Sequence, residues 1–199
     1  KLSKKDYLIL FIQAACGNFL FNLLLFYGLK YTSGMDAGVI LSLSPVFAGI
    51  LSYTFLKEKL GLKKIIGIAL AVAGIIYINV INPTGIATEY RLIGNLMIFG
   101  VAFFEGIFIV FGKYSSVKLN SYQLSFMITL VSFALFLPLS IYEIINFNFS
   151  TMTLETIVAL CYYTIFVGVF PYLLVYNSIQ EMTGSQAGVL STLIPISGV

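Results

Sequence analysis

Histidine is absent from this sequence of 199 residues, and cysteine occurs only twice, at Cys16 and Cys161. The absence of histidine removes the commonest zinc ligand and the commonest general base near neutral pH. The two cysteines show neither metal-ligand spacing nor a disulfide framework, and both lie in apolar runs, where a thiol usually acts as a small apolar side chain. We therefore expect no metal, no cofactor and no enzymatic activity.

Charged residues are also scarce. They make up 10% of the chain, against 59% hydrophobic residues and a mean hydropathy of +1.00. Soluble domains are about half apolar and a quarter charged, so this composition excludes a soluble protein. The apolar runs are about 17 to 24 residues long, enough to cross about 30 Å of hydrocarbon as helices. The sequence therefore predicts an all-α integral membrane protein, a multi-pass helical bundle.

Seven membrane spans are predicted, and the last of them is incomplete. They cover residues 7–29, 37–56, 65–81, 92–111, 121–144 and 156–176, and a seventh begins near Ser185. The seventh reaches Val199 without a flanking charge, and the chain begins at Lys1 rather than at a methionine. We therefore expect the sequence to be an internal fragment of a larger membrane protein.

The basic residues fall unevenly on the two sides of these spans. Short connections rich in lysine and arginine stay in the cytoplasm, so the distribution predicts a cytoplasmic N-terminal segment and a first span that runs outward. It also argues against nucleic acid as a partner, because topology accounts for the net charge of +3. One side carries only Lys30 and Arg91, and the other carries nine residues: Lys1, Lys4, Lys5, Lys57, Lys59, Lys63, Lys64, Lys113 and Lys118.

Two stretches of the chain resemble each other: GMDAGVILSLSPVFAG from Gly34 and GSQAGVLSTLIPISGV from Gly184. Aligning residues 17–49 with 167–199 gives eight identities in 33 pairs. The repeat joins the second span to the seventh, and an offset of five spans is odd, so the copies have opposite topology. Inverted repeats of this kind are typical of secondary transporters. Chance matching of apolar helices is the alternative.

The repeat also pairs Pro45 with Pro195, each about eight residues into its span. A proline there removes a backbone hydrogen bond and kinks the helix near the bilayer centre. Such breaks persist where they line a cavity or pack against protein. The prolines are therefore candidates for helix kinks with a gating role, and the alternative is that proline is simply common in membrane helices.

Other polar side chains stand inside the spans. Gln13, Asn18 and Asn22 lie in the first, where Asn18 and Asn22 share a helix face at i, i+4 spacing. Buried amides in a membrane either join helices or line a wet cavity, and both remain open here. We take the three as candidates for binding a substrate or coupling ion.

The sixth span adds Tyr162 and Tyr163, whose hydroxyls and rings make them further substrate-binding candidates. Ordinary packing is the alternative for either tyrosine. Tyr176 lies near the end of the same span, where a tyrosine can anchor a helix at the membrane interface.

Glu105, in the run FFEGIFIVFGK, is the one acidic residue deep within a predicted span. No lysine or arginine lies inside any predicted span, and we expect Lys113, about 12 Å away along the helix, to extend to the headgroups. A carboxylate at that depth is costly when ionised, so we expect Glu105 to spend much of its time protonated, as a proton-coupling residue must. The alternative is a permanently neutral glutamic acid that is hydrogen-bonded to a neighbouring helix.

The run YTSGMDAGVILSLSPVFAGILSYTFLKEKLGLKKIIGIALAVAG, residues 31–74, combines a Tyr-Thr-Ser start, a span centred on Pro-Val-Phe, Glu58 at the inner end, and paired glycines at Gly67 and Gly74. In these features the sequence resembles EamA-type transporters of the drug/metabolite transporter superfamily, and the stretch from Gly184 matches them again. The resemblance implies ten spans in two inverted five-span halves with both termini cytoplasmic. This chain would hold the third to the ninth span.

On that division, residues 1–82 are the rest of the first EamA repeat, with three spans. Residues 92–199 are the second repeat, with four spans, of which the last is truncated. The two halves would be built alike and inserted in opposite directions.

The leading functional prediction is a secondary transporter in the cell membrane that moves a small metabolite, an amino acid or another small solute, by alternating access, with proton coupling through Glu105. An integral-membrane enzyme is a weak alternative because no nucleophile has an evident base. A receptor is another, suggested by the seven visible spans. The expected partners are a small-molecule solute and the lipid bilayer, and a homodimer is left open.

Overall fold

A computed structural model of the protein describes residues 2–58, 90–116, 118–149 and 152–183, together with a few isolated residues. Every regular element in these ranges is a helix. The predicted span 65–81 and the predicted span from Ser185, with Pro195, lie outside the described residues. The second copy of the repeat therefore stays a prediction.

Five helical segments of the described residues are long and apolar enough to cross a membrane. They correspond to five of the predicted spans, each extended by a few residues, and they confirm the helical membrane bundle. Their bounds are Lys4–Tyr31, Gly34–Phe55, Arg91–Ser116, Ser121–Asn146 and Leu154–Ile179.

Three of these segments are not regular α-helices throughout. The first consists of α1 (Lys4–Ala14), a π-helical turn η1 (Ala15–Leu20) and α2 (Phe21–Tyr31). The second is broken into α3 (Gly34–Leu41) and α4 (Ser44–Phe55). The last consists of α8 (Leu154–Tyr163), a second π-helical turn η4 (Thr164–Val169) and α9 (Phe170–Glu181). The remaining two, α6 (Arg91–Ser116) and α7 (Ser121–Asn146), are continuous.

Small polar residues set the starts of these helices. Side chains at the N-cap accept hydrogen bonds from backbone N–H groups that have no partner inside the helix. Ser3 and Asp6 form a capping box at α1, and Asn120 and Gln123 form another at α7. Ser33 caps α3 in the same way. The caps explain why the connections between spans are short and polar.

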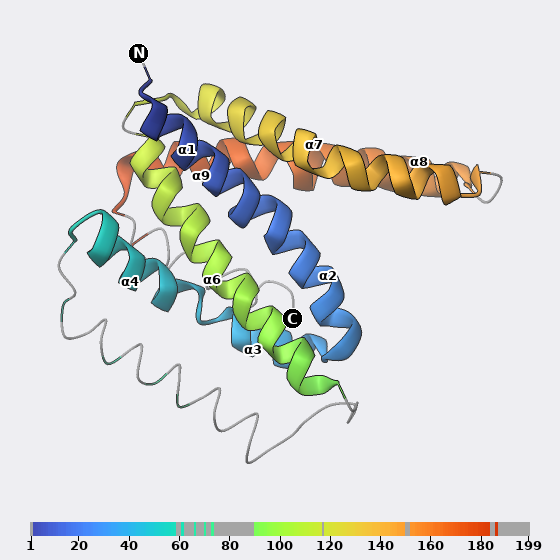
Figure 1. The fold of residues 1–199 in the computed structure, drawn as a ribbon, viewed down its shortest axis with the longest axis horizontal. Coiled ribbons are helices and arrows are strands. Elements are labelled where there is room, and N and C mark those ends of the chain that lie inside the picture. The colour runs from blue at the N-terminus through green and yellow to red at the C-terminus, as the bar shows by residue number, and fades with distance from the viewer. Residues whose placement is uncertain are drawn as a thin grey trace.

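The central element is α6, which packs against α1, η1, α2, α3, α4, α7 and α9. In Figure 1 it crosses the middle of the bundle, with α1 and α2 along one side and α4 along the other. The helices α7 and α9 pack together beside it, and Ser121 donates a hydrogen bond to Asn177 between them. By contrast, α8 has no buried residue.

The buried apolar residues form separate clusters at the contacts of these helices. Ala37 and Ile40 of α3 pack against Ile98 and Val101 of α6. Ala48 of α4 packs against α6 further along, and a third cluster joins α1, α7 and α9. In a bilayer, helix association depends on this close packing rather than on exclusion of water, because lipid tails are as apolar as the side chains.

Glycines on α6 allow two of these contacts to be unusually close. A Cβ built at Gly94 would lie 2.9 Å from the backbone nitrogen of Thr32, and one at Gly106 would lie 3.0 Å from the backbone nitrogen of Ala48. Real Cβ atoms almost never approach backbone that closely, so any other residue would force the helices apart. Gly106 thereby sets the distance between α6 and α4.

One ion pair joins helices at each end of the bundle. Asp6, at the start of α1, lies 2.6 Å from the ammonium of Lys118, between α6 and α7, and this hydrogen bond raises the pKa of Lys118 above its usual value of 10.5. Asp36 of α3 pairs with Arg91 at the start of α6. Each pair joins connections that the lysine distribution assigns to the same side of the membrane, so the fold agrees with the predicted orientation.

We expect Gly106→Ala in the intact protein to lower the free energy of unfolding by about 1–3 kcal/mol, the usual range for overpacking. SDS titration in detergent micelles measures this quantity. Gly100→Ala on the same helix is the matched control, because a Cβ there meets only the flexible end of Leu24, at 3.0 Å. Equal losses in both variants would show that the α4–α6 contact does not limit stability.

Candidate functional site

The second span is broken next to Pro45, where the sequence predicted a kink. The helix α3 ends at Leu41, Ser42 and Leu43 form a turn, and α4 begins at Ser44 with the proline in its first turn. Because proline has no N–H, it cannot donate to the carbonyl of Leu41, four residues earlier. The Ser44 hydroxyl lies 2.8 Å from that carbonyl oxygen and takes the place of the missing donor.

Glu105 of α6 lies against this break. Its Oε2 is 2.5 Å from the Oγ of Ser44, whose residue is only 1% exposed. The close approach of α4 at Gly106, the next residue, brings the two side chains within reach. Glu105 is thus hydrogen-bonded to a neighbouring helix, which is the contact that the alternative interpretation required. Sequence reasoning missed Ser44 as its partner, and the signal was a polar residue directly before the proline.

Gln13 of α1 joins three helices. Its amide nitrogen donates to the hydroxyl of Tyr176 in α9, at 2.9 Å, and lies 3.2 Å from the carbonyl oxygen of Phe108 in α6. Gln13 and Tyr176 are both fully buried. Of the two possibilities for Tyr176, the structure favours packing over an interfacial anchor: the phenol lies in the protein interior, where the Gln13 amide satisfies it. The arrangement favours a helix-joining role for Gln13.

Asn18 and Asn22 lie on one face of the first span, as their spacing predicts. The amide of Asn22 donates to the Oδ1 of Asn18 at 3.0 Å, and Asn18 donates to the Ser132 hydroxyl of α7 at 2.9 Å. Asn18 stands inside the π-helical turn η1, and π-helical turns recur at functional sites in membrane and soluble proteins. Asn18 thus joins two helices, Asn22 supports it from the same span, and both asparagines are half-buried.

Tyr162 and Tyr163 of α8 lie on the surface of the described residues. They are 62% and 59% exposed, and the ring of Tyr162 stacks on Phe166. The structure does not bring either tyrosine together with the buried polar side chains. A role for them in substrate binding stays a prediction.

A further polar cluster, at the start of α3 and α6, was not among the predicted site residues. The Nε of Arg91 lies 2.8 Å from Oδ2 of Asp36, which is fully buried, and Thr32 donates to the Oδ1 of Asn95 beside them. The sequence interpretation counted Arg91 only as a topology charge. The signal for the pair was Asp36 in the first turn of a span, where a carboxylate favours the helix N-terminus.

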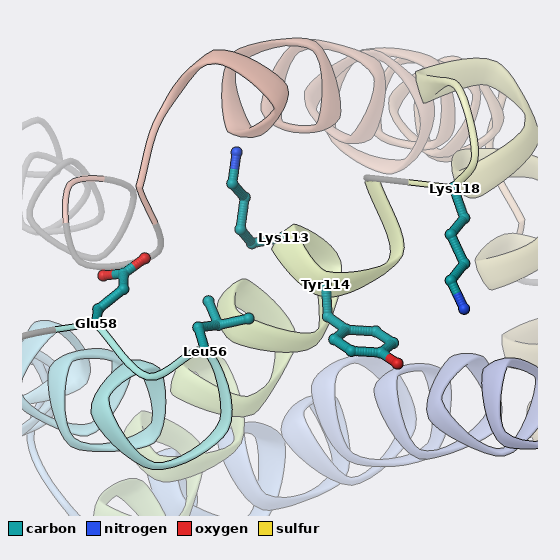
Figure 2. A pocket seen from close by; sticks show the side chains of 5 residues that line it. All are labelled: Leu56, Glu58, Lys113, Tyr114 and Lys118. Carbon is teal, nitrogen blue, oxygen red and sulfur yellow. The ribbon is translucent and has the colours of Figure 1, made fainter.

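The ends of α4 and α6 enclose a pocket of about 310 Å³. Figure 2 shows the side chains that line it: Leu56, Glu58, Lys113, Tyr114 and Lys118. The ammonium of Lys113 points to α9, where it donates to the carbonyl of Ile179 at 2.8 Å. The last carbonyls of a helix attract a cation, which accounts for this contact. That Lys113 extends to the headgroups stays a prediction.

The family model described as "EamA-like transporter family" matches residues 1–80 and 92–199. The chain belongs to this family. The EamA assignment confirms the resemblance that the run from residue 31 carries, and it agrees with an all-helical membrane bundle. Whether the two matched stretches are inverted copies stays a prediction, because the seventh span lies outside the described residues.

Several curated relatives are themselves named only as uncharacterized transporters. YetK of Bacillus subtilis is 33% identical over 199 residues, covering 100% of this chain and 60% of the relative. A protein of Methanothermobacter thermautotrophicus is 29% identical over 203 residues, and the match covers 100% of this chain and 57% of that protein. One of Archaeoglobus fulgidus is 30% identical over 199 residues, covering 98% and 68%. No solved structure gives a significant match.

The chain spans 57–60% of the length of the first two of these relatives. Within the EamA bundle, its described polar residues fall into two groups. Gln13 and Asn18 join helices and Asn22 bonds to Asn18, whereas Glu105 lies against a broken helix. The second group is the stronger candidate for function, because irregular backbone at membrane depth persists only where protein or a cavity surrounds it.

We expect Arg91→Met in the intact protein to lower the free energy of unfolding by about 3 kcal/mol. This is the lower end of the range for breaking a buried ion pair, because the Arg91 side chain remains 16% exposed. Adding Asp36→Asn should recover part of the loss, since the variant then has no uncompensated charge. A double-mutant cycle measured by SDS titration tests this.

Lys118→Met is the matched control, because the Lys118 side chain is 44% exposed in its pair with Asp6. Asp6 is only 6% exposed, but water reaches the ammonium side of the pair, so the loss should be smaller than at Arg91. Equal losses at the two ends, or no recovery in the double variant, would contradict a buried charge pair at Asp36.

Proposed function

We propose that the protein is a secondary transporter in the cell membrane that moves a small metabolite by alternating access and couples this movement to protons through Glu105. The observation that carries the proposal is the contact between Glu105 and the broken span α3–α4. Transporter sites are typically formed where membrane helices are discontinuous, near the middle of the bilayer. Membership of the EamA-like transporter family supports the same class of function.

The position of Glu105 supports the coupling role. It stands 13 residues after Leu92 and six before Phe111, the ends of the predicted span, so it lies about 9 Å or more from either end of that span. Ionisable residues at such depth are expensive and usually mark an ion or substrate pathway. Because Glu105 contacts the residue next to Pro45, a change in its charge acts directly on the break.

The transport proposal is tested with the intact protein reconstituted in liposomes. A broad panel of amino acids and other small metabolites is assayed for uptake and export, with and without a pH gradient. Flux of at least one solute above protein-free liposomes is expected. Absence of flux for the whole panel would reject transport and return attention to a receptor or enzyme.

We expect Glu105→Gln to abolish proton-driven accumulation while leaving membrane insertion intact. Glutamine keeps the size of the side chain and can still bond to Ser44, but it has no proton to release. Glu155→Gln, in the exposed first turn of α8, is the matched control and should behave like the wild type. Unchanged pH-driven flux in Glu105→Gln would remove Glu105 from the mechanism.

A further inference from the structure

The Ser44 hydroxyl lies between two oxygen atoms that compete for its single proton. The Leu41 carbonyl oxygen is 2.8 Å from Oγ, and Oε2 of Glu105 is 2.5 Å from it. A serine hydroxyl has one proton to donate and lone pairs to accept, whereas a carbonyl oxygen only accepts. The structure has Ser44 as the donor in both contacts, so its one proton is shared between the two oxygens. A protonated Glu105 can instead donate to Ser44, which leaves the serine proton for Leu41.

Loss of the Glu105 proton changes this arrangement. An ionised carboxylate is an acceptor only, and a hydrogen bond to it is stronger than one to a neutral carbonyl. The serine proton then turns to Glu105. The Leu41 carbonyl loses this donor, and Pro45, at the position that would normally supply the backbone N–H, has none to offer.

We propose that Ser44 is a proton-dependent switch residue that connects the charge of Glu105 to the break between α3 and α4. With Glu105 protonated, Ser44 caps the Leu41 carbonyl and holds the break in the geometry described above. When Glu105 releases its proton to water, Ser44 turns to the carboxylate, the Leu41 carbonyl is freed, and the break loosens. This inference rests on the proposed function and adds the step by which protonation reaches the backbone.

The other charged groups around α6 lie near helix ends. Apart from Glu105, every charged residue on α6 and on the described elements packed against it lies within four residues of a helix end, and the other titratable groups there are tyrosines and Cys16. On α6 these charges are Arg91 and Lys113, and on its neighbours they are Lys4, Lys5, Asp6, Lys30, Asp36, Glu143 and Glu181.

Ser42 provides a matched control within the same break. Its hydroxyl donates to the carbonyl of Val39, at 2.5 Å, and that carbonyl also accepts the N–H of Ser42, at 3.2 Å. The structure places Ser44, and not Ser42, in hydrogen-bond contact with Glu105. Removing either hydroxyl takes one donor from the break, but only Ser44→Ala removes the connection to the carboxylate.

The first experiment measures flux against pH for the intact protein in liposomes. Wild-type flux should change by up to about tenfold per pH unit, as for one titrating group. Ser44→Ala should retain flux down a solute gradient but lose most of this pH dependence, whereas Ser42→Ala should keep the wild-type profile. A wild-type profile in Ser44→Ala overturns the switch, and so does equal flattening in both serine variants.

Glu105→Gln separates this inference from the proposed function. If that variant keeps the wild-type pH profile, the coupling role of Glu105 fails. If it loses pH dependence while Ser44→Ala keeps it, only the switch fails. Loss of pH dependence in both variants, with Ser42→Ala unaffected, supports both.

The second experiment needs no substrate. Infrared difference spectra between acid and alkaline pH are recorded for protein labelled with ¹³C at the leucine carbonyls, and the Leu41 signal is identified by its loss in Leu41→Ile. In the wild type, the Leu41 band should shift to higher frequency as Glu105 ionises, because the carbonyl loses a hydrogen bond. The shift should vanish in Glu105→Gln, which keeps a donor at position 105. A Leu41 band that does not move with pH in the wild type overturns the switch.

Discussion

A backbone carbonyl inside a membrane must have a hydrogen-bond donor, and Pro45 removes the one that Leu41 would have had. The local structure around the break follows from this constraint. Ser44 supplies a donor, its position at the start of α4 brings it against α6, and Gly106 lets the two helices approach until Ser44 meets Glu105. A half-buried carboxylate within a span and a broken helix are each costly alone, and here each provides part of the polar environment of the other.

The other polar side chains in the spans differ in their burial and in the backbone around them. Gln13 is fully buried and directs its amide to two different helices, so its removal would affect packing first. Asn18 and Asn22 are half-buried and stand at the π-helical turn η1, where the backbone is already irregular. Because of the irregular turns and the break, α6 and α7 are the two described spans that are continuous α-helices. The other described spans contain an interruption, and most of them pack against α6.

The sequence predicted the five described spans, the irregularity at Pro45 and the shared face of Asn18 and Asn22, because these depend on local properties: apolar length, a missing N–H and helical periodicity. It could not predict which partners meet. Ser44 lies 61 positions from Glu105, and Gln13 lies 163 from Tyr176. One sequence carries no record of such pairings, so it leaves the place of Tyr176 open between packing and the interface, and it does not reveal the Asp36–Arg91 pair.

The two glycine contacts of α6 also limit how the bundle can move. Gly94 and Gly106 are 12 residues apart, about 18 Å along the helix, and each faces the backbone of a neighbouring segment. If α6 slid by one turn, Ile98 and Val110 would take their places, and no branched side chain fits against that backbone. These contacts therefore oppose a one-turn slide of α6 past α2 and α4. They leave tilting of α6 about the two contact points as the movement that the packing allows.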